Sequence, residues 1–494
     1  MRLALFLLAL SVYLLSMTGT LGIDEETMYL VTESIAERGG VNVGPSMLRE
    51  TWTVPARGGG RYSILEVGQS VLALPFYYIG KLGASIAPTQ LRPYATRAAV
   101  AAMGPVFGAL AVLLVALLVE ALGHSPARAA AVALLAAFGT ILWPYARTFY
   151  REPVLAALFL AIVWALVRWR DDGRMRWVVL ASTAFFLAGI VRVLALGLFP
   201  FFAAAIWRAG LDVHARGDGA PARGPGRPYM GNVAAAAIFG VGAIAALAVD
   251  LGYNALRFGS PWATGYPKEE TFSHPLHIGL YGFLFSPGRS VFLFCPVLVI
   301  AMFGLPRMWR EARETLGLVA AVVIFHLCVY GCWWAWANGR GLWGPRYLVP
   351  MLPLALLPAA WVKPGRLWIG VLGLSIAIQA MGVLTWGRFL AAPEKERARV
   401  EVKAFDVTHS AVLSGDAWAS LGTLRWDRAY EPSVLRDPHS PEAHDLKATT
   451  AAVWWAYAWR ANLPLRTLAP AVVLAALALG SMIALGVRAF RNLA

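Results

Sequence analysis

Three carboxylates in this sequence lie next to long apolar segments, where they could take part in chemistry. Asp24 and Glu25 closely follow the apolar N-terminal run, and Glu152 precedes Pro153 at the start of another apolar segment. A carboxylate at this depth could act as general base on a hydroxyl while a phosphate-linked lipid presents its headgroup nearby. The same residues also fit ordinary helix N-termini, where acids and proline are favourable. In the ordinary interpretation, the stretch DEETMYLVTESIAERGG, which begins at Asp24, forms a solvated amphipathic helix that Gly39 ends.

Arginines form the second group of candidates. Their guanidinium groups suit bidentate recognition of phosphate and stay charged when partly buried. We interpret Arg346, within the stretch WGPRY, as a ligand-binding residue, and Arg192 lies between two short apolar segments, where an unpaired charge would be costly. Other arginines expected outside or near the outer interface include Arg61, Arg147, Arg151, Arg257 and Arg340. Some of these arginines are expected to snorkel or to pair with acids such as Glu66.

The composition indicates an all-α polytopic membrane protein. Of 494 residues, 59% are hydrophobic and only 14% are charged, whereas soluble domains carry about 25% charged residues. The formal net charge of +15 could suggest a nucleic-acid partner. However, the basic residues fall in short loops between apolar segments, which membrane topology explains better. We therefore expect a lipid bilayer and no nucleic acid as a partner.

About twelve apolar segments are long enough to be considered membrane spans, since a span needs ~20 residues. The first of them is interpreted as a retained signal-anchor helix and not as a cleaved signal peptide. Segments 177–190 and 193–208 are short and could be tilted or broken. The expected spans are 3–22, 97–119, 129–145, 153–168, 177–190, 193–208, 231–252, 289–305, 315–335, 346–362, 367–387 and 467–487.

The loops rich in Lys and Arg predict the orientation of these spans. They fall on one side, which the positive-inside rule makes cytoplasmic, so both termini are inside and Asp24 is outside. This parity requires segment 68–84 to be interfacial or re-entrant within a long first external loop, 23–96, that carries juxtamembrane helices. Residues 388–466 are expected to form a small external subdomain or cap. The predicted organisation is thus a transmembrane module (1–387), this cap, and a last helix with a cytoplasmic tail (467–494).

Several familiar motifs are absent from the sequence. It contains no P-loop, no HExxH, no GxSxG elbow and no EF-hand loop. His274 and His277 lie close together, but no third metal ligand accompanies them, so we interpret them as loop histidines.

The candidate residues together resemble those of the GT-C superfamily, the integral-membrane glycosyltransferases that use polyprenyl-phosphate sugars. The nearest likeness is to bacterial relatives of the protein O-mannosyltransferases and aminoarabinose transferases. The first acidic pair of that family is similar to Asp24-Glu25 with Tyr29, and its second acid and preceding Arg are similar to Glu152 and Arg147 in YARTFYRE. The stretches RFGSPWATGY and WGPRYLVP also look like motifs of the family. The likeness covers residues 1–362.

The resemblance implies an inverting transfer to an acceptor hydroxyl on the external face of a bacterial inner membrane. The acceptor is a glycan, a lipid or a protein, and a divalent metal ion held by Asp24 and Glu152 is an open possibility. Spacing to the tyrosine selects Glu25 as the base, whereas alignment of the Asp-Glu pair selects Asp24, which we favour. The implied catalytic residues are Asp24, Glu25 and Glu152. The implied substrate-binding residues are Tyr29, Arg61, Tyr62, Arg147, Arg151, Arg192, Arg257, Tyr266, Arg340, Arg346 and Tyr347.

Two other functions are alternatives to this one. A transporter or flippase for lipid-linked sugars would place ionisable residues near mid-membrane on several helices, but the expected spans contain almost no acids. A polysaccharide polymerase or ligase also uses external arginines and should tolerate the loss of Asp24. The glycosyltransferase hypothesis requires Asp24 or Glu25, Glu152 and Arg346 to meet at one external site.

Overall fold

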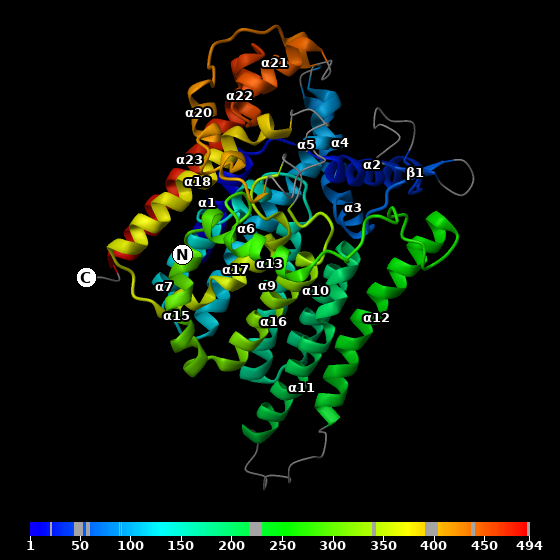
Figure 1. The fold of residues 1–494 in the computed structure, drawn as a ribbon, viewed down its shortest axis with the longest axis vertical. Helices are drawn as coiled ribbons and strands as arrows, with labels where there is room; N and C mark the ends of the chain where they lie inside the picture. Colours follow the sequence, from blue (N-terminus) through cyan, green and yellow to red (C-terminus); the bar gives the residue numbers. More distant parts are fainter. Residues whose placement is uncertain are drawn as a thin grey trace.

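The computed structural model describes residues 1–19, 22–43, 53–55, 60–87, 89, 91–216, 230–337, 342–390, 404–435 and 440–491. This part of the chain is almost entirely helical (Figure 1). The strands in it are β1 (Val54–Pro55) and β2 (Arg61–Tyr62), which pair antiparallel with Val54 opposite Tyr62. This small pair is a departure from the all-α expectation. Arg340 lies outside the described residues.

The helices follow the chain in one long series. In the first half they are α1 (Arg2–Leu15), α2 (Ile23–Arg38), α3 (Gly68–Leu72), α4 (Leu74–Ile86), α5 (Arg92–Ala101), α6 (Met103–Ala121), α7 (Pro126–Phe138), α8 (Leu142–Ala146), α9 (Glu152–Asp172), α10 (Met175–Val191), η2 (Val193–Leu198) and α11 (Phe199–Arg216). In the second half they are α12 (Met230–Phe258), α13 (Leu276–Phe285), α14 (Val291–Phe294), α15 (Leu298–Glu311), α16 (Arg313–Gly331), η3 (Arg346–Met351), α17 (Leu352–Ala355), η4 (Leu357–Trp361), α18 (Arg366–Leu390), η6 (Val407–His409), α20 (Asp416–Gly422), η7 (Pro432–Leu435), α21 (Pro441–Thr449), α22 (Trp454–Arg460), η8 (Leu465–Leu468) and α23 (Ala469–Arg491).

Six helices among the described residues are long and apolar enough to cross a membrane, so the chain is a multi-pass membrane protein. They are Tyr94–Ala121, Glu152–Asp172, Gly231–Phe258, Arg313–Gly331, Arg366–Thr385 and Leu465–Arg488. The expected count of about twelve therefore stays a prediction. One expected span, 346–362, is divided into η3, α17 and η4. It contains Pro350, Pro353 and Pro358, and proline lacks the N–H that a continuous helix requires.

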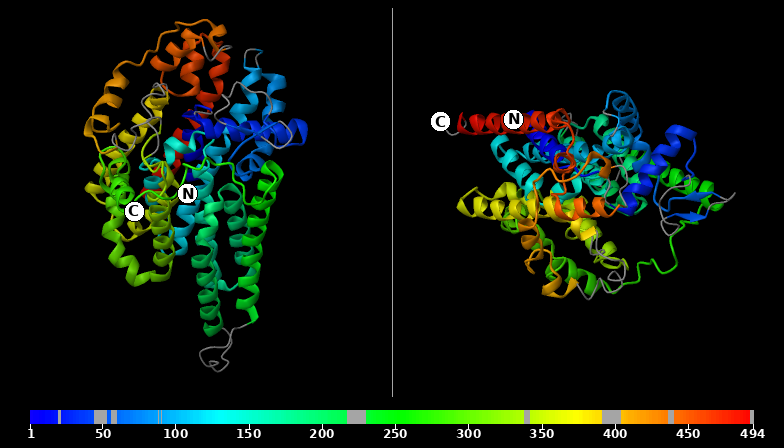
Figure 2. Two further views of the ribbon diagram at one scale, coloured as in Figure 1. Left: turned by 45° about the vertical axis from the view of Figure 1, so that its right-hand side comes forward. Right: turned by 90° about the horizontal axis from the view of Figure 1, so that it is seen from above.

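Both termini lie at one end of the helix bundle. Arg2 Nε donates to Glu120 Oε2 over 2.8 Å, which joins the start of α1 to the end of α6. The N-terminal amine is also close enough to Arg488, near the end of α23, to feel its charge. Helices α1 and α23 pack side by side (Figures 1 and 2).

The opposite end of the bundle carries α2 to α5 and the segment with α20 to α22 (Figure 1). Helix α5 is joined to α2 by the ion pair of Arg97 with Glu26 at 2.5 Å. Helix α4 packs against α5 and therefore lies at this end as well. In the chain, α4 and α5 come between α1, which leads to this end of the bundle, and α6, which leads back to the other end. Its position relative to the membrane surface remains a prediction.

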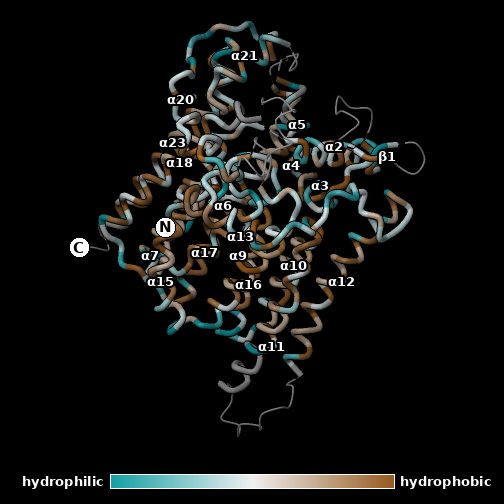
Figure 3. The backbone as a smooth tube through the Cα atoms, viewed as in Figure 1, coloured by the Kyte–Doolittle hydropathy of each residue, from teal (hydrophilic) through white to brown (hydrophobic). Residues whose placement is uncertain are grey.

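Helix α9 is the central helix of the bundle. In the span Glu152–Asp172, 83% of the most apolar 18-residue stretch is buried inside the protein. The corresponding share is 11% for Leu465–Arg488 and 28% for Gly231–Phe258. Hydrophobic residues dominate the exposed α12, while hydrophilic ones gather around α21 (Figure 3). The apolar faces of α12 and α23 are thus available to lipid, and α9 is shielded from lipid by its neighbours.

Candidate active site

The first turn of α2 is held by Glu25, whose side chain is fully buried. Its Oε2 atom accepts a hydrogen bond from the backbone N–H of Gly22 at 2.8 Å, which closes a capping box at the helix N-terminus. Its Oε1 atom accepts from the backbone N–H of Phe149 at 2.6 Å. Both oxygens therefore bind backbone groups, and Glu25 fixes α2 against the turn 147–151. The helix ends at Gly39, which adopts the left-handed conformation (φ 63°).

Removal of the Glu25 carboxyl group should destabilise the protein without acting on chemistry directly. We expect Glu25→Ala to lower the free energy of unfolding by about 2 kcal/mol, because two buried N–H groups lose their acceptor. Glu25→Gln keeps one acceptor oxygen and should lose about half as much. Thermal unfolding of the purified protein measures both effects. Wild-type stability of Glu25→Ala would contradict this structural role.

Arg346 joins Asp24 and Glu152, three residues far apart in the sequence. Arg346 Nε donates to Glu152 Oε1 over 2.6 Å, and Arg346 Nη2 donates to Asp24 Oδ2 over 2.5 Å. The side chains of Arg346 and Glu152 are each 7% exposed, whereas that of Asp24 is 32% exposed. Asp24 is thus the member of this acid–arginine cluster that solvent or a substrate can reach.

Aromatic side chains hold the guanidinium of Arg346 in place. Its central carbon lies 4.5 Å from the ring centroid of Tyr150 and 5.5 Å from that of Tyr347, both within cation–π range. Tyr150 also approaches Gly22 so closely that a Cβ at that position would clash with the tyrosine hydroxyl. Glycine at the N-cap of α2 therefore lets Tyr150 and Asp24 share one site.

The charges around Asp24 keep it ionised. Burial alone would raise the pKa of Asp24, but the positive charges of Arg346, Arg151 and Arg192 outweigh burial and hold the pKa below its ordinary value. Burial would lower the pKa of Arg346, but Glu152 and Asp24 raise it well above its ordinary value. Asp24 and Arg346 are therefore both charged at neutral pH.

A second buried ion pair lies beside this cluster. Arg151 Nη1 donates to Glu66 Oε2, with side chains only 3% and 10% exposed. Glu66 Oε1 also accepts from the backbone N–H of Val193 at 3.2 Å, next to the break between α10 and η2. Burial would raise the pKa of Glu66, but Arg151 and Arg192 hold it below its ordinary value. This pair orients Arg151 and anchors the backbone next to Arg192.

The two ion pairs meet at a small cavity of about 10 Å³, roughly the room of one water molecule. It is lined by Arg151, Glu152, Leu155, Arg192, Tyr330, Tyr347 and Pro350. Within the described residues, Glu152 Oε2 is buried and has no hydrogen-bond partner. In the same part of the chain, the guanidinium of Arg192 has no hydrogen bond or ion pair and lies 5.8 Å from the ring centroid of Tyr330. Both residues line this small cavity.

Tyr266 and Tyr347 belong to the wall of this site. Tyr347 stacks on Tyr330 with ring centroids 4.6 Å apart, and its hydroxyl accepts from Trp333 Nε1 at 3.1 Å. Tyr266 meets the same Trp333 edge-on, with centroids 6.3 Å apart. The segments that follow α12 and α16 therefore meet beside Arg346.

Other candidate residues lie away from the acid–arginine cluster. Arg147 is fully buried and donates to the backbone oxygens of Ser16 and Ala452, and Arg257 donates to those of Ser63 and Leu65. Tyr29 faces α5, where its hydroxyl meets Thr96 at 2.8 Å. Arg61 and Tyr62 lie in β2, where Arg61 binds Thr53. The hydrogen bonds of Arg147 and Arg257 fasten loops together, which places these two residues in the scaffold of the site.

Asp24 and Glu152 do not fit a shared divalent metal ion. The guanidinium of Arg346 lies between them and pairs with both, so it occupies the position that a bridging cation would require. Among the described residues, no group of three or more His, Cys, Asp or Glu side chains could hold a metal.

Several residues of the site were not among the candidates. Glu66 was expected only as a partner for an arginine, and Tyr150 and Tyr330 were not named as candidates. The sequence does indicate a role for Glu66, because this acid lies next to the apolar segment 68–84 and a buried carboxylate requires a cationic partner. The tyrosines carry no such signal.

Comparisons with known proteins found no match in sequence and two weakly similar solved structures. No family model matches the chain, and no curated protein matches it. Two solved structures of the oligosaccharyltransferase of Archaeoglobus fulgidus are similar, with identities of 11% and 13% and TM-scores of 0.45 and 0.43. One is AglB in complex with an inhibitory peptide and a dolichol-phosphate, and the other is the apo form.

The match extends over 83% of this chain but only 60% of the solved chains. The chain thus spans about 60% of the length of the structures it matches. The activity, substrates and partners of this chain are therefore inferred from the residues of its own site.

Proposed function

We propose that this protein is an inverting glycosyltransferase that moves a sugar from a polyprenyl-phosphate donor to an acceptor hydroxyl. The proposal rests on one observation, the convergence of Asp24, Glu152 and Arg346 at the end of the bundle opposite the termini. We place this end on the external face of a bacterial inner membrane, with both termini in the cytoplasm. In this organisation, residues 1–387 carry the site, 388–466 form the external cap, and 467–494 hold the last helix and tail.

Asp24 is the proposed general base. Its Oδ2 atom is held by Arg346, and its side chain is partly exposed, so its other oxygen can accept the proton of the acceptor hydroxyl. The hydroxyl oxygen attacks the anomeric carbon while the bond from that carbon to the phosphate oxygen breaks on the opposite face. A single displacement of this kind inverts the anomeric centre.

Arg192 is the proposed contact of the leaving phosphate. It lines the same cavity as Glu152 and forms no direct ion pair or hydrogen bond among the described residues, although Glu66 lies close enough to feel its charge. A guanidinium already in place stabilises the charge that develops on the phosphate as the bond breaks. Glu152 orients Arg346 through one oxygen and offers the other to a sugar hydroxyl.

A transfer assay in detergent tests this function. Purified protein is incubated with a polyprenyl-phosphate sugar and a mixture of glycan, lipid and peptide acceptors, and release of polyprenyl phosphate is measured. We expect release that depends on acceptor and inversion at the anomeric carbon of the product. A flippase needs a bilayer and would release nothing in micelles. Retention of configuration, or full activity without Asp24, would also contradict the proposal.

The pH dependence of transfer should follow Asp24. Its pKa in the folded protein lies below its ordinary value, so the ionised base is present above that value and is lost only as the pH falls through the depressed pKa. We expect kcat/KM to be constant between about pH 5 and pH 7 and to decline only below about pH 4. An acid limb centred near neutral pH would point to another base.

Removal of divalent metal ions should have little effect on transfer. Because Arg346 lies between the two carboxylates, we expect activity in excess EDTA to stay within about twofold of the untreated enzyme. The control is the same enzyme with EDTA and an added excess of Mg²⁺. A loss that Mg²⁺ or Mn²⁺ restores would show that a cation takes part after all.

A further inference from the structure

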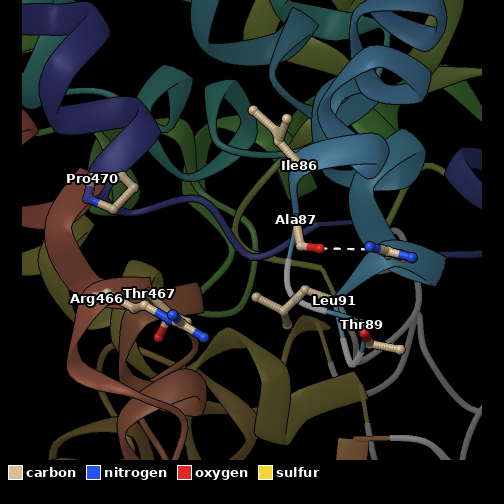
Figure 4. Close-up of a pocket in the computed structure, with 8 residues that line it drawn as sticks. Ile86, Ala87, Thr89, Leu91, Arg466, Thr467 and Pro470 are labelled. Carbon is tan, nitrogen blue, oxygen red and sulfur yellow. Dashed lines mark hydrogen bonds between the residues drawn. The ribbon is translucent and has the colours of Figure 1, made fainter.

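A second and larger pocket lies at the end of the bundle that carries α2 to α5. Its volume is about 720 Å³, within the range of small-molecule sites. One wall comes from the end of α4 and the turn into α5, and the other from η8 and the start of α23. Figure 4 shows Ile86, Ala87 and Leu91 facing Arg466 and Thr467 across the opening, with Pro470 above. The lining residues are Ile86, Ala87, Thr89, Leu91, Arg92, Arg466, Thr467 and Pro470.

The charge in this Arg92–Arg466 pocket is positive and uncompensated. None of its described lining residues is acidic. Arg92 Nε donates to the backbone oxygen of Ala87 at 3.2 Å, and across the described residues neither guanidinium forms an ion pair. Two exposed arginines that share a pocket without a carboxylate repel each other. An anion between them removes this repulsion, and phosphate matches the guanidinium geometry best.

The pocket also lies at the depth of lipid headgroups. The apolar spans Tyr94–Ala121 and Leu465–Arg488 begin within two residues of Arg92 and Arg466, respectively. The far end of the first span is joined to α1 by Glu120, and its near end is joined to α2 by Arg97. Arg92 therefore lies on the same face as Asp24, where the first span enters the membrane.

An apolar surface leads away from the pocket along α4. Tyr78, Ile79, Leu82 and Ile86 share one face of this helix and are 50%, 62%, 74% and 88% exposed. Such a surface beside two arginines suits a ligand with a phosphate group and a hydrocarbon chain. A soluble phosphate would use only the arginines.

We propose that the Arg92–Arg466 pocket binds the phosphate headgroup of an anionic glycerophospholipid, with an acyl chain along the apolar face of α4. The choice of a glycerophospholipid over the sugar carrier rests on the proposed function, which places the carrier phosphate at Arg192. The two cavities share no lining residue. Bound lipid would join α4 and α5 to α23.

Native mass spectrometry of the full-length protein tests this site. The protein is extracted from vesicles of equal parts phosphatidylglycerol and phosphatidylcholine, and retained lipids are counted. We expect wild type to retain phosphatidylglycerol preferentially and Arg92→Ala/Arg466→Ala to retain roughly tenfold less, since each surface arginine contributes to binding of anionic lipid. Thr467→Asp, which keeps both arginines, should also reduce retention because it adds a negative charge to the pocket.

The matched control is Lys268→Ala/Arg425→Ala, which removes two exposed cations outside the pocket and should retain lipid as wild type does. Unchanged retention in the Arg92/Arg466 variant would overturn the proposal. In a parallel measurement, polyprenyl phosphate is added to the vesicles. A variant that loses polyprenyl phosphate but keeps phosphatidylglycerol would also overturn the proposal. Lipid retention is measured without turnover, so failure of the proposed sugar transfer leaves this result interpretable.

Discussion

Asp24→Asn should reduce sugar transfer by about 10²–10⁴-fold, the usual contribution of a general base. Asparagine has nearly the same shape and can still accept the hydrogen bond from Arg346 Nη2, now made to Asp24 Oδ2 at 2.5 Å. It cannot take a proton from the acceptor hydroxyl. The loss should therefore fall on kcat, while KM for the donor and the melting temperature change little. Steady-state kinetics with a polyprenyl-phosphate sugar measures this effect.

The control for Asp24→Asn is Glu26→Gln, on the same turn of α2. Glu26 pairs with Arg97 at 2.5 Å, and the two side chains are 23% and 35% exposed. Neutralising Glu26 removes a carboxylate beside the site without touching Arg346, so transfer should stay close to wild type. Equal losses in the two variants would show that charge near α2, and not a base at Asp24, controls the rate.

Arg346→Gln should abolish transfer and also destabilise the fold. The guanidinium is 7% exposed and neutralises both Asp24 and the equally buried Glu152. Removing one partner of a buried ion pair costs about 3–5 kcal/mol, because the remaining charge is left without compensation. Loss of the positive charge beside the reacting atoms adds a loss of about 10²–10³-fold in kcat. Arg346→Lys keeps the charge but cannot bind Glu152 and Asp24 through two separate nitrogens. Its stability and its kcat should both be intermediate.

Two further variants separate stability from chemistry at Arg346. Arg97→Gln removes a similar guanidinium, which pairs with Glu26 and lies 4.3 Å from the ring centroid of Tyr29, but outside the site. It should lower stability by about 1 kcal/mol or less and leave transfer intact. Arg346→Gln/Glu152→Gln removes the stranded charge of Glu152 and should regain most of the stability without regaining activity. Recovery of both together would mean that Arg346 acts only through folding.

Much of the site could be expected from local sequence features. Acids next to an apolar run, an arginine in WGPRY and a proline after Glu152 each indicate a residue near a membrane surface. A helix that begins near Asp24 and ends at Gly39 follows from capping preferences. The meeting of Asp24, Glu152 and Arg346 was an expectation of the family resemblance, and both carboxylates contact Arg346.

The roles within the arginine set could not be expected from sequence. Arg147, Arg192, Arg257 and Arg346 all lie beside apolar segments, and each required some partner. Arg147 and Arg257 bind backbone oxygens, Arg346 binds two carboxylates, and Arg192 faces a cavity. The partner depends on which loop packs against each arginine, and that is a property of helix packing.

Sequence alone thus established a helical membrane protein and an acid-rich turn beside its first apolar run, because hydrophobicity and capping act over a few residues. Only the packed chain separates Asp24 from Glu25. Consecutive residues on a helix point about 100° apart, so packing of α2 on the turn 147–151 buries Glu25 against the N–H of Phe149. The same packing turns Asp24 toward Arg346, which lies 322 residues away in the chain.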